Sequence, residues 1–186
     1  MGLVTKLLVT GAGGSMAGAA AAWYYTKQIT DCTASVMQKS GTLFHTVQKP
    51  GVHTDVWQVP FKPELTATEL SRAFWTSDVM RLERKILAAA NVGKARTDEE
   101  IRSMNFTVGE QVGPFVVVAK TDSEVLYCWH EKIGGYSWLA VTEDGMLQFG
   151  SALNQSPIVS VCLPPHLIYA RICLASAHKR LLAHVN

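Results

Sequence analysis

Motifs for catalysis and for metal binding are missing from this chain of 186 residues. Its four cysteines form no CxxC pair and its six histidines show no HxxxH or HExxH spacing, so a zinc site is not indicated. No serine lies in a nucleophile-elbow sequence. The acidic residues gather at 98–100 and near turns, where solvation alone explains them. We therefore expect no enzyme activity, no cofactor and no metal.

Strong charge of either sign is also lacking. The formal net charge is +2, and no run of Lys or Arg is long enough to form a phosphate-binding stripe, so nucleic acid is not an expected partner. Hydrophobic residues make up 48% of the chain. That fraction is high for a water-soluble protein, but it is explained if one segment lies in lipid.

An uncharged stretch of 20 residues lies between Lys6 and Lys27. As a helix it would rise roughly 30 Å, which is about the thickness of the hydrocarbon core of a bilayer. Trp23, Tyr24 and Tyr25 stand at one end, as amphipathic aromatics do at the lipid–water boundary. We expect a continuous helix over residues 7–25 within a transmembrane anchor that covers residues 1–27.

The anchor is rich in glycine and alanine, and its small residues fall on two stripes at helical spacing. Small residues let helix backbones approach within van der Waals contact, the main source of helix association in lipid. We therefore expect this helix to pack among the helices of other membrane subunits. The small residues that would make this contact are Gly11, Gly14, Ser15, Gly18, Ala19 and Ala22.

The N-terminal segment has two other interpretations. A cleaved targeting peptide is the first, but the segment contains no arginine and differs from a typical transit peptide. The second is the glycine turn of a short-chain dehydrogenase, suggested by Thr10-Gly11, Gly14 and Ala17. That fingerprint needs a following strand that ends in an acidic residue, and the next thirty residues offer none. An uncleaved membrane anchor is therefore the preferred interpretation.

Residues 28–50 show no strong periodicity and are interpreted as a connecting arm, whereas residues 51–186 predict one α+β domain. Helix-start signals occur at Thr66, Thr76 and Thr97. Arg171, Lys179 and Arg180 argue against a second membrane span in the last helix. The other expected elements are a strand within 51–61, antiparallel strands at 114–120, 124–131, 136–142 and 145–153, and a helix over 166–185 that Pro164-Pro165 opens.

Two helices have faces that the sequence distinguishes. After Thr76, the residues Val79, Leu82, Ile86 and Ala90 share one face, while Arg81, Glu83, Arg84 and Lys85 fill the other. The charged group is most simply a solvated surface. In the last helix Leu174 and Leu181 lie on one side, and we expect both to be deeply buried against the sheet.

Four segments resemble a bacterial domain family of unknown function that is related to the START-like helix-grip superfamily. They are Ala73–Leu87, Tyr127–Val141, Leu147–Leu153 and Leu167–Leu181. The resemblance implies an antiparallel sheet curled around a long C-terminal helix, often with an apolar cavity between them. The residues that could line such a cavity are Tyr127, Trp129, Tyr136, Trp138 and Phe149, although strand aromatics more often simply fill a core.

These expectations favour a single-pass accessory subunit of a multi-subunit membrane complex, with other subunits and the lipid bilayer as partners. Accessory subunits of mitochondrial respiratory-chain complexes often carry one uncleaved N-terminal helix, which suggests the mitochondrial inner membrane by analogy alone. The alternative is a membrane-tethered binder or carrier of a lipid, quinone or other apolar ligand. A membrane-bound enzyme ranks last.

Overall fold

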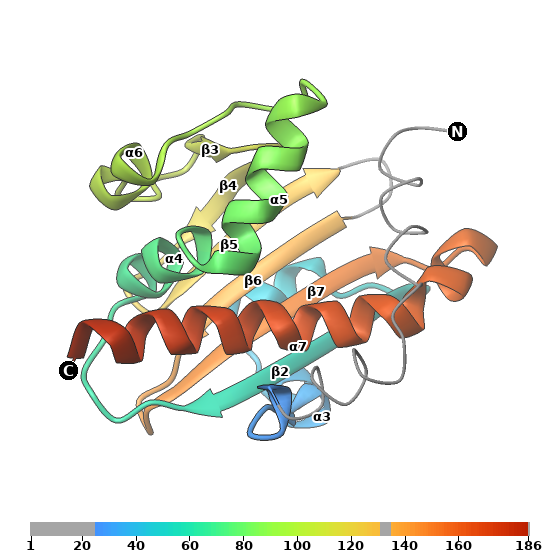
Figure 1. Ribbon diagram of the computed structural model, residues 1–186. Helices are drawn as coiled ribbons and strands as arrows, with labels where there is room; N and C mark the ends of the chain where they lie inside the picture. The colour runs from blue at the N-terminus through green and yellow to red at the C-terminus, as the bar shows by residue number, and fades with distance from the viewer. Residues whose placement is uncertain (1–24, 131–134, 186) are drawn as a thin grey trace.

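A computed structural model describes residues 25–130 and 135–185 of the chain (Figure 1). Residues 7–24 of the predicted N-terminal helix, with its small residues Gly11, Gly14, Ser15, Gly18, Ala19 and Ala22, lie outside these ranges. Within them, the apolar helix that is long enough to cross a membrane is C-terminal, over Val159–His184. The apolar helix that the structure describes is therefore not the N-terminal one that the sequence predicted.

A seven-stranded antiparallel sheet forms the centre of the α+β fold (Figure 1). Its order is β1-β2-β7-β6-β5-β4-β3, so the last strand of the meander, β7, pairs with β2. The predicted antiparallel meander is thereby confirmed. The strands are β1 (Thr30–Asp31), β2 (Val52–Pro60), β3 (Gln111–Val112), β4 (Phe115–Lys120), β5 (Glu124–His130), β6 (Gly135–Val141) and β7 (Met146–Asn154).

The connecting helices begin where the start signals predicted. Helix α4 (Ala67–Trp75) has a complete capping box between Thr66 and Glu69, and α6 (Asp98–Ser103) has another between Thr97 and Glu100. Each box satisfies backbone N–H groups that the first helical turn leaves without partners. Helix α5 (Asp78–Ala89) follows Ser77. Local capping chemistry thus fixes the starts of α4 and α6, whereas Ser77 makes no side-chain capping bond at the start of α5.

Helix α7 (Pro157–Val185) is longer than predicted, because it contains Pro164 and Pro165 and does not start after them. A proline in a helix removes the hydrogen bond to the carbonyl four residues earlier. Those carbonyls belong to Ser160 and Val161, which are both exposed, so water can satisfy them. In Figure 1 the first, orange turns of α7 are set apart from the long red run that crosses the sheet.

The helices and one face of the sheet enclose the larger core. Leu174 is fully buried and Leu181 is 7% exposed, as predicted. The aromatic rings of Phe74 and Phe149 lie 5.2 Å apart between α4 and β7. Burial of such side chains is the main stabilising contribution of this layer.

The other face of the sheet is covered by the segment that was expected to be a connecting arm. It forms β1, α3 (Thr33–Gln38) and the 3-10 helix η1 (Leu43–Val47). Phe44 stacks on Trp138 with ring centroids 5.3 Å apart. The Glu124 carboxylate accepts hydrogen bonds from the Leu43 amide and the Trp138 indole, each at 2.7 Å. Residues 28–50 are therefore a layer of the domain.

Helix α5 buries a different face from the predicted one. Met80 and Leu87 are buried, whereas Leu82 and Ile86 are 62% and 39% exposed. The apolar residues of α5 do recur at helical spacing, but the helix contacts the domain through the neighbouring face that carries Met80 and Leu87. Leu82 and Ile86 consequently point away from the core.

Candidate functional site

The five aromatics predicted to line a cavity are divided between the two faces of the sheet. Tyr127 and Phe149 belong to the core under the helices, and the ring of Trp129 lies beside that of Phe115, which packs on the same core. Trp138 and Tyr136 lie on the opposite face, with the layer formed by α3 and η1. The division follows from the strand register. Tyr127 pairs with Ser137, and Leu126 pairs with Trp138, so Tyr127 and Trp138 point to opposite faces of the sheet.

A buried polar cluster joins β2, β7 and α7 beneath the first half of α7. The Ser151 hydroxyl donates to Asp55 Oδ1 at 2.5 Å, and its oxygen lies 2.7 Å from His166 Nε2. His53 Nε2 lies 3.4 Å from the same carboxylate oxygen, and the Trp57 indole donates to Asp55 Oδ2 at 2.9 Å. Asp55 and Ser151 are 4% and 2% exposed. The cluster is therefore buried within the domain, and His53 Nε2 lies near the carboxylate without making a hydrogen bond.

Burial alone would raise the pKa of Asp55. The hydrogen bond and charge of His166, together with hydrogen bonds from Ser151 and Trp57, instead hold that pKa below its usual value. These partners favour the ionised carboxylate because each presents a positive charge or a donor to it. Asp55 thus serves as the buried anion to which donors from three elements converge.

The cluster has the residue types of a serine hydrolase but not the connections. In such an enzyme the serine hydroxyl gives its proton to the histidine, and the acid contacts the other ring nitrogen. Here Ser151 donates to Asp55, and His166 faces both groups with the same nitrogen, Nε2. This arrangement orients α7 against the sheet and does not activate a nucleophile.

Sequence analysis did not find this cluster, because its members are far apart in the chain. Asp55 and Ser151 are separated by 96 residues. The sequence did contain one sign of the cluster. Asp55 is an acid on the core-facing side of β2, and His53 and Trp57, two residues away on either side, point to the same face. A charged residue on a core-facing strand position needs partners, and Asp55 finds them on β7 and α7.

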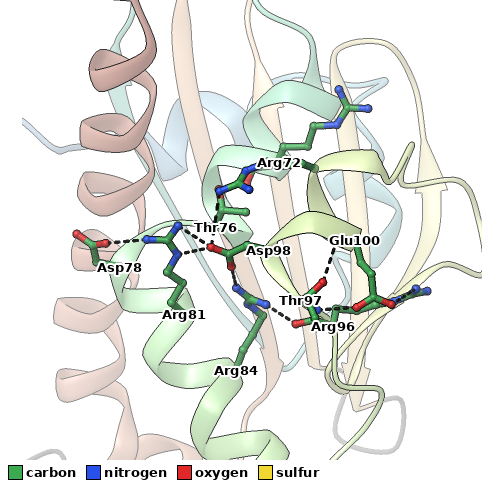
Figure 2. Close-up of polar contacts among 10 residues, drawn as sticks. Arg72, Thr76, Asp78, Arg81, Arg84, Arg96, Thr97, Asp98 and Glu100 are labelled. Atoms are coloured by element: carbon green, nitrogen blue, oxygen red, sulfur yellow. Dashed lines mark hydrogen bonds and ion pairs between the residues drawn. The ribbon is translucent and has the colours of Figure 1, made fainter.

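A second polar cluster joins α5 to the start of α6 (Figure 2), and several of its residues line a hollow that is open to solvent. Asp98 accepts from Arg81 Nε at 2.6 Å and also binds Arg84. Arg84 donates from its other terminal nitrogen to the Arg96 carbonyl at 2.5 Å, and its side chain is only 10% exposed. Part of the charged face of α5 is therefore built into the domain and is not simply solvated.

Large apolar side chains are exposed on the outer surface of the helical layer. Val161 and Ile168 are 78% and 52% exposed on α7, and Leu82 and Ile86 are exposed on α5. Tyr169, 38% exposed, links the two helices through a hydrogen bond from its hydroxyl to Glu83. We call these five residues, Leu82, Ile86, Val161, Ile168 and Tyr169, the outer helical face. Exposed apolar side chains that form a contiguous patch are typical of contact surfaces, whereas single ones are not.

The described chain begins beside α7. Thr26 is buried, and its carbonyl accepts a hydrogen bond of 3.3 Å from Arg171. The Arg171 guanidinium lies 5.3 Å from the centre of the Trp57 ring, and Tyr25 packs against the main core. The end of the predicted anchor is therefore attached to the same helix that carries Val161 and Ile168.

Comparisons of this chain with protein-family models, with curated proteins and with solved structures find no match. Among the residues that the structure describes, no group of three His, Cys, Asp or Glu is arranged to hold a metal ion.

Proposed function

We propose that this chain is a single-pass accessory subunit of a multi-subunit membrane complex, in which the domain acts by contact and has no turnover of its own. One observation carries the proposal. The outer helical face exposes large apolar side chains on α5 and α7, and α7 also holds the end of the predicted membrane anchor through Arg171 and Thr26. A contact surface beside the membrane is what an accessory subunit requires.

The chemistry of the buried cluster supports a structural role. Asp55, Ser151 and His166 hold α7 on the sheet, and Ser151 donates to the carboxylate that would otherwise orient the histidine of a catalytic triad. The most enzyme-like set of side chains in the described residues thus explains the position of α7. It also explains how the outer helical face is presented.

A membrane-tethered carrier of a lipid or quinone is the alternative. A carrier needs an apolar cavity of several hundred Å³, and a helix-grip sheet would provide it beneath its long helix. In this domain Phe74, Phe149 and Leu174 occupy that region as buried core residues. The filled interface favours the scaffold over the carrier.

The order of the strands and the position of α7 agree with the helix-grip family that the sequence resembles, and we propose that fold family here.

We further propose the mitochondrial inner membrane, and a respiratory-chain complex, as the location of this subunit. The support is the analogy with accessory subunits that have one uncleaved N-terminal helix. Fractionation of the organelles of the source cell, followed by extraction of the membranes with mild detergent, tests this location directly.

The decisive experiment combines deletion with a matched pair of surface variants. Val161 is 78% exposed on the outer helical face, and Val108, 67% exposed, lies in the loop after α6. Val161→Glu should reduce copurification of the complex after mild extraction, whereas Val108→Glu should not. Deletion of the protein should lower the amount of assembled complex and its activity in proportion.

Two outcomes would contradict the proposal. Equal copurification of both valine variants with the complex would show that the outer helical face contacts no partner. Normal assembly after deletion, with accumulation of one lipid or quinone, would favour the carrier.

A further inference from the structure

We propose that the hollow between α5 and α6 binds a phosphate group, carried either by a lipid headgroup or by a small soluble phosphate ester. This inference does not depend on the accessory-subunit proposal, because it rests on different residues. The hollow has a volume of about 440 Å³, and four cationic side chains line it: Arg81, Arg84, Lys85 and Arg96.

The cations outnumber the acids in the lining. Asp98 is the one carboxylate among the lining residues, and it is already shared by Arg81 and Arg84 (Figure 2). Arg102 lies 3.9 Å from the same carboxylate. Asp78 and Glu100 pair with Arg81 and Arg96 from outside the lining. A second anion is therefore the chemical complement of this surface.

Two of the cations have capacity to bind such an anion. Arg84 is nine-tenths buried, and the Arg96 carbonyl and Asp98 accept from its two terminal nitrogens, so further N–H donors of the guanidinium remain. Lys85 is exposed and makes no ion pair within the described part of the chain. An ammonium beside these donors adds a mobile positive charge. Arg84 and Lys85 both belong to the lining of the hollow.

The geometry favours phosphate as the ligand chemistry. Arginine presents a planar fork that matches phosphate oxygens, and lysine binds phosphate as a point charge. Ala88 contributes a small side chain to the lining. The volume exceeds that of a bare phosphate ion, so part of an attached glycerol or sugar would also fit.

The test uses the full chain purified in a neutral detergent. Calorimetric titration with inorganic phosphate, at constant ionic strength set with chloride, measures the affinity for the shared chemical group. Titration with mixed micelles that contain phosphatidic acid, against micelles that contain phosphatidylcholine, measures the affinity for a lipid headgroup. We expect saturable binding in at least one of these arms.

Three variants decide whether binding occurs in the hollow. Lys85→Gln removes a charge that has no described partner, and it should weaken binding about tenfold, as expected for one charge-assisted contact. Ala88→Leu keeps every charge and the helix propensity of α5, and it should weaken binding by filling the space. Lys62→Gln, an exposed lysine outside the lining, is the matched control and should change the affinity less than twofold.

The outcomes separate the two sources of phosphate. Binding of inorganic phosphate without tighter binding of phosphatidic acid supports a soluble phosphate ester as the ligand. Much tighter binding of phosphatidic acid than of phosphatidylcholine, lost in Lys85→Gln, supports a headgroup. Absence of saturable binding in both arms overturns the proposal, and so does equal weakening by Lys85→Gln and Lys62→Gln. None of these results depends on copurification of a complex.

Discussion

The two halves of α7 differ in composition, because residues 159–169 carry no charge whereas residues 170–181 include Arg171, Lys179 and Arg180, and different forces hold them to the domain. None of residues 159–169 is fully buried, whereas eight of the residues in 170–181 are buried beneath the other helices and on the sheet. The first half is attached by His166 to the polar cluster at Asp55, and the second half by apolar contacts around Leu174. Length and apolar composition therefore cannot distinguish a core helix from a surface helix.

This contrast explains why α7 is long and apolar enough to cross a membrane. Its hydrophobic residues serve two purposes, because those in the second half fill the core and those in the first half form part of the outer helical face. A helix that is apolar on all sides can be buried within a protein or within lipid. Here α7 packs on β2 and β7 of the sheet, whereas Val161 and Ile168 are 78% and 52% exposed.

The largest effect should come from the core half. Leu174→Ala removes a fully buried side chain and should lower the free energy of unfolding by about 2–5 kcal/mol, through lost burial and the cavity left behind. The matched control is Leu182→Ala, because Leu182 is 43% exposed on the same helix. Urea unfolding of the full chain in detergent measures both changes. Similar midpoints for Leu174→Ala and the unmodified chain would show that α7 does not pack on the sheet.

The core half of α7 and the meander were predictable because their signals are local. The positions of Leu174 and Leu181 follow from a helical period, and the strands follow from alternation between short turns. The partners of Asp55 were not predictable in this way, since nearly a hundred residues separate it from Ser151. Leu82 shows the converse, because a correct helical period did not reveal which face of α5 would meet the domain.

A substitution at Asp55 tests the polar attachment of the first half of α7. Asp55→Asn keeps the size of the side chain but removes the charge that Ser151, Trp57 and the two histidines face. We expect a loss of about 1–3 kcal/mol, because Asn replaces one carboxylate oxygen by a donor and so leaves either Ser151 or Trp57 without its acceptor. Asp122→Asn, at an exposed turn, is the control.

The same carboxylate predicts a pH dependence. The pKa of Asp55 is lowered in the folded protein, so its contribution to stability is present above the usual value of 3.8. That contribution is lost as the pH falls below 3.8 through the folded pKa. Melting curves between pH 6 and pH 2.5, compared with those of Asp55→Asn, should converge at the acid end. Parallel curves over the whole range would contradict the ionised state of this group.

Glu83, which accepts a hydrogen bond from Tyr169 between α5 and α7, should give stability a pH dependence of the opposite sign. Desolvation raises the pKa of Glu83, beside Tyr169, from 4.5 to about 7. The folded state therefore favours the protonated acid, and this stabilisation is present below pH 4.5 and lost as the pH rises through 7. Glu83→Gln should raise stability at pH 8 by on the order of 1 kcal/mol, reduced from the full shift by partial exposure. Glu99→Gln, on an exposed turn of α6, should leave the pH profile unchanged.

The smallest effect on stability should come from the surface half of α7, where the proposed function is most sensitive. Ile168 is 52% exposed, so Ile168→Ser should change the free energy of unfolding by no more than about 0.5 kcal/mol. If the outer helical face contacts other subunits, the same change should still lower the fraction of the chain that copurifies with the complex. Thermal melts and quantitative extraction on one preparation measure both properties. A loss of stability comparable to that of Leu174→Ala would show that Ile168 belongs to the core. Unchanged stability together with unchanged association would show that the exposed half of α7 faces solvent, and the two halves would then differ in burial but not in function.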